Sequence, residues 1–118
     1  MTLDLSIYEK EEYCYLTTRG RITGKPHEIE IWFVLHENSL YLISGGMDKS
    51  DWVRNLLKEP NVTLRISGQT FPAIAQVKTG DQTAVRDLMA DKYKERESDG
   101  SLSEWAGTAL VVGFTPKP

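Results

Sequence analysis

The sequence has little of what several classes of protein need. Cys14 is the single cysteine among 118 residues, so the chain cannot form an internal disulfide, which is typical of a reducing compartment. No apolar run approaches the roughly 20 residues that a membrane-spanning helix requires. The N-terminal stretch contains neither the basic nor the apolar region of a signal peptide. These absences predict a soluble, cytoplasmic protein with no stable membrane insertion.

Signals for metal ions, nucleic acids and covalent catalysis are also weak. The two histidines, His27 and His36, belong to no cysteine or histidine cluster with metal-ligand spacing, so we predict no metal site. A formal net charge of −3 argues against a general nucleic-acid binder, although a local basic pocket is compatible with it. No serine lies in a nucleophile elbow, and Cys14 lies within a strand pattern. Covalent catalysis therefore has no clear candidate.

Alternating and β-branched stretches predict strands and two helices in one domain that spans residues 1–118. The expected order is three strands, a helix, two strands, a helix and a last strand. It lacks the repeated strand–helix pattern of a doubly wound parallel sheet. We therefore predict a mainly β (α+β) fold, a small antiparallel barrel or a strongly twisted sheet that hides its edges. The expected strands cover residues 13–18, 28–35, 40–44, 61–67, 70–78 and 109–114.

Capping residues and apolar spacing define the two expected helices. The first helix is expected to begin at Asp48 or Ser50 and to end before Pro60, and the second is expected to begin at Asp81. In each helix, apolar residues recur three and four positions apart on one face. These faces consist of Val53, Leu56 and Leu57 in the first helix and of Val85, Leu88, Met89 and Tyr93 in the second.

A basic loop with two glycines separates the first two expected strands. The sequence GRITGK places Arg21 and Lys25 on backbone that Gly20 and Gly24 leave flexible, with the hydroxyl of Thr23 between them. Backbone N–H groups, a guanidinium and a hydroxyl can together hold a phosphate. The alternative is a solvated hairpin loop with little packing, whose charges only keep the protein soluble. The loop matches neither the dinucleotide fingerprint nor the Walker loop.

Small and aromatic residues mark a second candidate region. The stretch SGGM at residues 44–47 ends a strand just before a helix, where it could accept an anion or form a plain turn. Trp52, in the first turn of that helix, could cover a flat ring or pack on Leu56. Trp32 shares a strand face with two glutamates and is expected to be half exposed. Trp105 is expected to be structural.

The spacing of these motifs resembles the deazaflavin-dependent nitroreductase family. These are small split-barrel proteins related to the flavin binders of the pyridoxamine-phosphate-oxidase type. The resemblance covers about half of the chain, in order and with close spacing. The matching residues are Thr17, Thr18, Gly20, Arg21, Thr23, Gly24 and Pro26, then Gly45 and Gly46, then Trp52, Asn55, Leu56 and Pro60.

The resemblance implies a split β-barrel of the FMN-binding type, usually a homodimer, that binds the deazaflavin coenzyme F420. It implies hydride transfer to a small acceptor such as a quinone, an enone or a nitro compound. Two alternatives are an FMN-dependent enzyme of the same fold and a cofactor or lipophile binder without turnover. Tyr93 is the candidate proton donor, against the alternative of a packing residue on an amphipathic helix. The implied cofactor-binding residues are Arg21, Ile22, Thr23, His27, Ser44, Gly45, Trp52 and Asn55.

Overall fold

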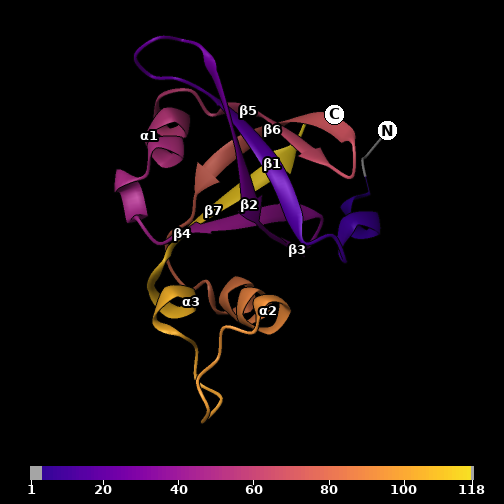
Figure 1. Cartoon of the computed structure of the whole chain (residues 1–118), viewed down its shortest axis with the longest axis vertical. Coiled ribbons are helices and arrows are strands. Elements are labelled where there is room, and N and C mark those ends of the chain that lie inside the picture. Colours follow the sequence, from indigo (N-terminus) through magenta and orange to yellow (C-terminus); the bar gives the residue numbers. More distant parts are fainter. Residues whose placement is uncertain (1–3, 118) are drawn as a thin grey trace.

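The structure is a computed structural model that describes residues 4–117, in which seven antiparallel strands form one sheet (Figure 1). The strand order is β2–β1–β5–β6–β7–β4–β3. The strands are β1 (Tyr13–Arg19), β2 (Pro26–Trp32), β3 (Val34–His36), β4 (Ser39–Ser44), β5 (Asn61–Ile66), β6 (Gln69–Val77) and β7 (Leu110–Pro116). The helices are α1 (Asp51–Lys58), α2 (Thr83–Tyr93) and α3 (Glu104–Thr108), with 3₁₀ turns η1 (Leu5–Tyr8) and η2 (Met47–Lys49). No helix within this range is long and apolar enough to cross a membrane.

A bend at Phe33 closes the sheet into a split barrel. β2 and β3 follow each other along the chain with only Phe33 between them, yet they lie at opposite ends of the strand order. The sheet therefore curls until the two halves of one bent strand meet. The prediction of a single strand over residues 28–35 is wrong at this point. Trp32 is the last residue paired with β1, Val34 is the first paired with β4, and the Phe33 side chain is buried in the barrel.

Two side chains of α2 hold the bend. The backbone N–H of Phe33 donates to the hydroxyl oxygen of Tyr93 (2.9 Å), and that hydroxyl lies 2.8 Å from the Phe33 carbonyl and 2.7 Å from the Glu12 carbonyl. Since a hydroxyl has one proton, it donates to one of these carbonyls at a time. The Lys92 ammonium donates to the Phe33 carbonyl (3.0 Å) and lies 3.8 Å from the centroid of the Phe33 ring. Burial raises the pKa of the Tyr93 hydroxyl, which therefore keeps its proton.

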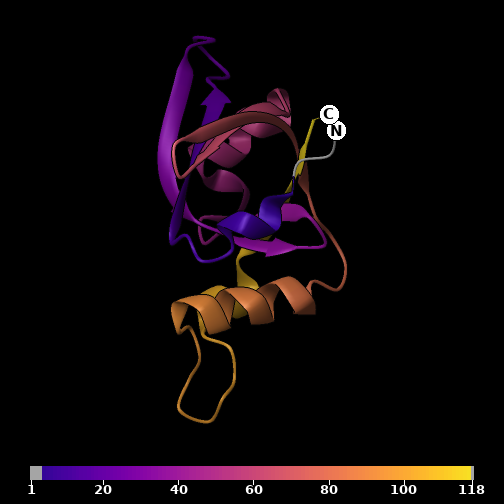
Figure 2. The same ribbon diagram turned by 90° about the vertical axis from the view of Figure 1, so that its right-hand side faces the viewer.

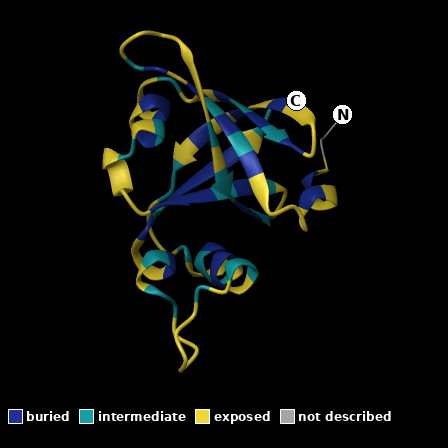
Figure 3. Cartoon of the chain, in the orientation of Figure 1, coloured by how far each residue is buried: buried dark blue, intermediate teal, exposed yellow. Residues whose placement is uncertain are grey.

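Apolar side chains pack in two clusters on opposite sides of the sheet. One fills the barrel, and the other lies between the outer face of β4 and β7 and helices α2 and α3, which pass beneath the barrel in Figure 2. Figure 3 shows buried residues concentrated in the strands, while the loop between β1 and β2 is largely exposed. The barrel cluster includes Leu16, Leu40, Leu64 and Phe114, and the outer cluster includes Val34, Ile43, Val85, Met89 and Val111.

Each of the two predicted apolar helix faces includes one leucine that is exposed in the structure. Leu57 is 59% exposed and Leu88 is 38% exposed, although both were expected to face the core. In α1 the polar Asn55, which is only 4% exposed, faces inward beside Val53 and Leu56. Its amide donates to the Thr18 hydroxyl (3.1 Å), so hydrogen bonding decides which face of this short helix is buried. Apolar spacing alone cannot reveal such a contact.

The helix starts differ slightly from the predicted caps. Ser50 occupies the cap position of α1, as one of the two predicted alternatives, but its hydroxyl bonds to the Ser44 hydroxyl (2.7 Å) instead of to the helix. Gln82 occupies the cap position of α2. Asp81 lies one residue earlier and accepts from the Thr83 N–H (3.0 Å). The prediction of Asp81 as the cap is therefore wrong by one residue, although its carboxylate does bond to the N–H of the first helical residue.

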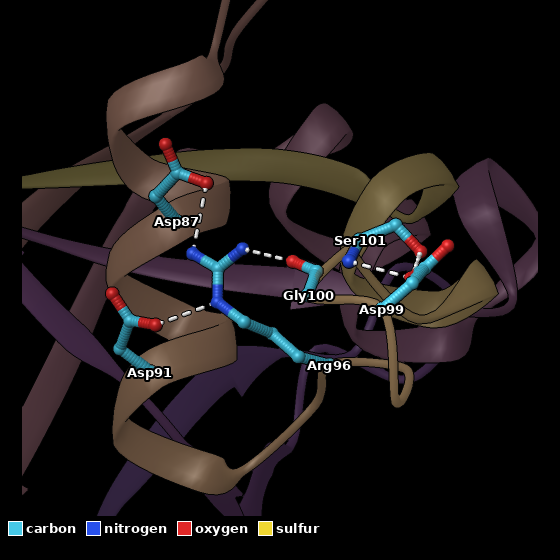
Figure 4. A network of polar contacts seen from close by, with 6 residues as sticks. All are labelled: Asp87, Asp91, Arg96, Asp99, Gly100 and Ser101. Atoms are coloured by element: carbon cyan, nitrogen blue, oxygen red, sulfur yellow. Dashed lines mark hydrogen bonds and ion pairs between the residues drawn. The ribbon is translucent and has the colours of Figure 1, made fainter.

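Arg96 ties the loop between α2 and α3 back onto α2 (Figure 4). Its guanidinium donates to the carboxylates of Asp91 (2.7 Å) and Asp87 (3.1 Å) and to the Gly100 carbonyl (2.9 Å). The bonds to Asp91 and Asp87 raise the pKa of Arg96. A second arginine of α2, Arg86, donates to two carbonyls of the α3 segment. Helix α3, which the sequence did not predict, thus takes a defined position against α2.

Removal of the Tyr93 hydroxyl tests the anchoring of the bend. Tyr93→Phe leaves the Phe33 N–H without its partner in a half-buried position, and such an unsatisfied group costs about 1–3 kcal/mol. We expect the free energy of unfolding, measured by urea titration, to fall by about that amount. Tyr41→Phe is the matched control, because Tyr41 packs in the same outer cluster and its hydroxyl makes no hydrogen bond within residues 4–117. Equal losses in both variants would contradict the anchoring role.

Candidate functional site

The loop between β1 and β2 is closed by its own backbone. The N–H of Gly20 donates to the Lys25 carbonyl (2.8 Å), and the N–H of Gly24 donates to the Gly20 carbonyl (2.8 Å). Gly24 has a φ of +74°, which favours glycine. A Cβ on Gly20 would lie 2.6 Å from Nε2 of His27, so a side chain at this position would displace the exposed imidazole. The loop is therefore a defined turn with His27 packed against its base.

Arg21 is anchored to α1 and does not project freely into solvent. Its guanidinium donates to Oδ1 of Asn55 (2.9 Å) and to the Asp51 carboxylate (3.1 Å), and its backbone N–H also reaches Oδ1 of Asn55 (3.2 Å). Lys58 donates to the Arg21 carbonyl (2.9 Å). The expectation of a loop with little packing is therefore wrong for Arg21. Because Asn55 also bonds to Thr18, a chain of contacts joins the loop, α1 and the interior of β1.

Several donors of the loop remain available for an anion. A guanidinium has five N–H groups, and Arg21 uses two of them. Within the described residues, the backbone N–H groups of Ile22 and Thr23 donate to no protein acceptor. The Asp51 partner is 85% exposed, so its ion pair with Arg21 is weak and can yield to a better acceptor. The Thr23 hydroxyl accepts from the Lys25 N–H (3.2 Å) and keeps its own O–H as a further donor.

A groove of about 480 Å³ lies between this loop and α1, and we call it the loop groove. Its lining comes from the loop and from β1, β2 and α1, and it includes Trp52. Six of the eight predicted cofactor-binding residues line it. They are Arg21, Ile22, Thr23, His27, Trp52 and Asn55, and the lining is completed by Thr18, Gly20, Glu28, Ile29 and Asp51.

A second groove, of about 640 Å³, is also lined by Trp52, and we call it the aromatic groove. It contains the two remaining predicted residues, Ser44 and Gly45. The sequence missed Tyr13, Glu30, Ile31, Ile43 and Ser50, and it assigned Trp105 a structural role only. Because Trp52 lines both grooves, the eight predicted residues lie along two adjacent grooves, which we together call the cleft.

The walls of the aromatic groove are held rigidly. Trp32 stacks on Tyr93 with ring centroids 4.3 Å apart and planes 5° from parallel, and it meets Trp105 edge to face at 5.7 Å. Gly45 passes so close to Trp105 that a Cβ would lie 3.1 Å from the indole. The Ser44 hydroxyl bonds to the Met47 carbonyl (3.0 Å) and to Ser50, which fixes the turn before α1. A flat ligand would therefore meet a preformed aromatic surface.

Tyr93 lies behind this wall. It lines neither groove, and its hydroxyl is bonded to backbone groups of Phe33 and Glu12. Trp32 separates its ring from the aromatic groove by stacking on it. The structure thus shows how Tyr93 supports the site, and its role as a proton donor stays a prediction.

The cleft fits a ligand with an anionic part and a flat part. The arginine and free N–H groups occur at one end, and the tryptophans occur at the other. Coenzyme F420 has this form, because a phosphate-bearing tail extends from a planar deazaflavin ring. Arg21, Ile22 and Thr23 would hold the phosphate, and Trp52 and Gly45 would contact the ring.

Similar solved structures show the same fold at low sequence identity. One is an F420 reductase, with 19% identity and a TM-score of 0.67 over 97% of this chain and 93% of that one. Another, from Listeria innocua, is provisionally described as a pyridoxamine 5'-phosphate oxidase, with 18% identity and a TM-score of 0.71 over 97% and 90%. A third is described as a domain-swapped dimer, with 17% identity and a TM-score of 0.67 over 91% and 81%.

A comparison with curated proteins gives no match. A model of one protein family, in contrast, matches residues 6–102, which is most of the chain and includes both grooves except for Trp105. The family uses the reduced form of coenzyme F420. The chain therefore belongs to the F420H(2)-dependent quinone reductase family and is an F420-dependent oxidoreductase.

Proposed function

We propose that the enzyme passes a hydride from reduced F420 to a small organic acceptor, such as a quinone, an enone or a nitro compound. The observation that supports this proposal is the pair of adjacent grooves that share Trp52, one beside the arginine-bearing loop and the other lined by tryptophans. Bound reduced F420 supplies the hydride, and the protein supplies position and electrostatics.

The proposed contacts divide along the cleft. Arg21 and the N–H groups of Ile22 and Thr23 bind the phosphate, and the arginine is positioned in advance by Asn55. His27 lies beside this subsite and lines the same groove. Preorganised donors of this kind bind an anion without a further cost in loop ordering. The loop is therefore the main determinant of cofactor affinity in this proposal.

The ring-binding part is formed by Trp52, Ser44 and Gly45. Trp52 lines both grooves, and in this proposal its indole covers one face of the ring. The acceptor then enters from the aromatic groove, beside Trp32 and Trp105. Such a stacked arrangement orients the two reacting carbons and limits the access of water.

We also propose that the enzyme is a homodimer that acts in the cytoplasm. One similar structure is described as a domain-swapped dimer. Exposed apolar side chains, including Ile74 (46%) on β6 and Leu57 on α1, give this chain surface that a partner could cover. The free, buried Cys14 is compatible with a reducing compartment.

A turnover assay tests the proposed reaction. We expect the purified protein to oxidise reduced F420 with a quinone, an enone or a nitroaromatic as acceptor, followed by the absorbance of the oxidised deazaflavin. Reduced FMN is the matched comparison, and it should support slower turnover if the cofactor is F420. Absence of turnover with every acceptor class would reject the proposed reaction.

The same assay tests Tyr93 as the proton donor. If Tyr93 donates a proton, Tyr93→Phe should change the pH dependence of kcat, whereas a positioning role should change only the stability of the protein.

Two substitutions in the loop test the phosphate subsite. Arg21→Ala should weaken F420 binding by about 10- to 150-fold, since a hydrogen bond to a charged group contributes roughly 1.5–3 kcal/mol. Lys25 is exposed, so Lys25→Ala should cost well under about tenfold. Asp51→Asn removes the competing carboxylate and should strengthen binding. Calorimetric titration with oxidised F420 measures all three, and equal weakening in the two alanine variants would indicate a nonspecific charge effect.

Light scattering tests the assembly. We expect a mass of about twice the 13.4 kDa of one chain at micromolar concentration. A monomer mass under these conditions would contradict the proposed dimer and would leave the cleft, which one chain forms by itself, unaffected.

A further inference from the structure

The aromatic groove carries one uncompensated negative charge. Glu30 is the only residue in its lining that is charged at neutral pH. Within residues 4–117 it forms no ion pair, and its hydrogen bond from the Tyr15 hydroxyl is long, at 3.4 Å. The nearby cation Arg65 is already engaged, because it pairs with Glu28 (3.1 Å) and lies over the Tyr15 ring (4.1 Å). The carboxylate of Glu30 is therefore available to a ligand in the groove.

Aromatic side chains in the groove also favour a positively charged ligand. The faces of indole rings are negative, and tryptophan is the aromatic residue that attracts cations best. Trp32, Trp52 and Trp105 all line the groove, with Tyr13 beside them. Three tryptophans and one unpaired carboxylate favour a positively charged ligand and disfavour an anionic one. The loop groove has the opposite preference at Arg21, so the two ends of the cleft differ in the charge that they select.

We infer that the aromatic groove is an acceptor subsite selective for flat aromatic cations that carry a C=N⁺ group, and that Glu30 sets this preference. The inference rests on the proposed function, because it takes the acceptor to enter from this groove. It narrows the acceptor class from small organic molecules in general to planar cations, ahead of neutral and anionic molecules of the same shape.

The chemistry of such an acceptor matches the residues that are present. Hydride adds to a ring carbon conjugated with the C=N⁺ group, which is C9 in an acridinium ring. The π electrons shift through the ring to become a lone pair on nitrogen, and the acceptor becomes neutral. Reduced F420 releases one proton in addition to the hydride, and this proton passes to solvent. No proton has to be delivered to the acceptor. This suits a groove whose nearby phenol, Tyr93, is bonded to backbone groups.

The loss of charge in this step decides which kinetic constant Glu30 controls. The positive charge of the acceptor decreases along the reaction, so Glu30 stabilises the bound cation more than the transition state or the neutral product. An interaction of this kind lowers KM without raising kcat. Glu30 is therefore a specificity-determining residue, and it also favours release of the neutral product.

A matched set of ligands measures the preference directly. N-methylacridinium, acridine and acridine-9-carboxylate share one ring system and carry charges of +1, 0 and −1 at pH 8. Calorimetry in the presence of saturating oxidised F420 should give the tightest binding for the cation and the weakest for the anion. Glu30→Gln should weaken binding of the cation about two- to fivefold, strengthen binding of the anion by a similar factor and leave binding of acridine unchanged, as for an exposed charge pair.

Glu37→Gln is the control variant, because it removes the same charge from the hairpin between β3 and β4 and lines neither groove. Equal shifts in the two variants, a cation that binds no better than acridine, or competition between the cation and F420 would overturn the inference. In turnover, Glu30→Gln should raise KM for N-methylacridinium and leave kcat unchanged or higher.

The two proposals fail in different ways. If the charge preference is observed but reduced F420 is never oxidised, the proposed function is wrong and the cation subsite stands. If neutral quinones are reduced and no charge preference is observed, the proposed function stands and this inference is wrong.

Discussion

The backbone of Phe33 and the side chains that hold it determine the shape of the molecule. At this residue one strand leaves the β1 ladder and joins the β4 ladder, and Tyr93 and Lys92 satisfy the polar groups that neither ladder can satisfy. The barrel is closed by this bend. The same Tyr93 ring supports Trp32, so the contact that closes the fold also positions one wall of the aromatic groove. Fold and site therefore share a structural anchor.

The sequence predicts elements better than it predicts how they are joined. Alternation located the strands, but it cannot show that residues 28–35 divide at Phe33, because the residues on both sides of the bend are extended and favour strands. Leu57 and Leu88 have helical spacing and are exposed nevertheless, since the inward position of α1 is taken by Asn55, whose amide bonds to Thr18. The hydrogen bond joins residues 37 positions apart, so it leaves no trace in the periodic pattern of apolar residues along the sequence.

The residues of the candidate site were also only partly predictable from the sequence. Glycines, Arg21 and Trp52 could be selected from local motifs, and the structure gathers them in one cleft. Trp105 and Glu30 could not be selected in this way, because each comes from a segment that contains no recognisable motif. Trp105 lies on the α3 segment, which Arg86 links to α2, and it packs edge to face against Trp32. Glu30 differs from Glu28 in its surroundings, since Arg65 pairs with one of them and leaves the other free.

The position of β7 has a consequence for biosynthesis. This strand lies between β6 and β4 and pairs with both, although it is the last strand along the chain. Until residues 110–116 have been made, β6 and β4 each expose an unpaired edge next to apolar side chains. Such edges are templates for pairing with other chains. The nascent protein is therefore most prone to aggregation just before its last strand emerges, and a chaperone that covers strand edges would act during that interval.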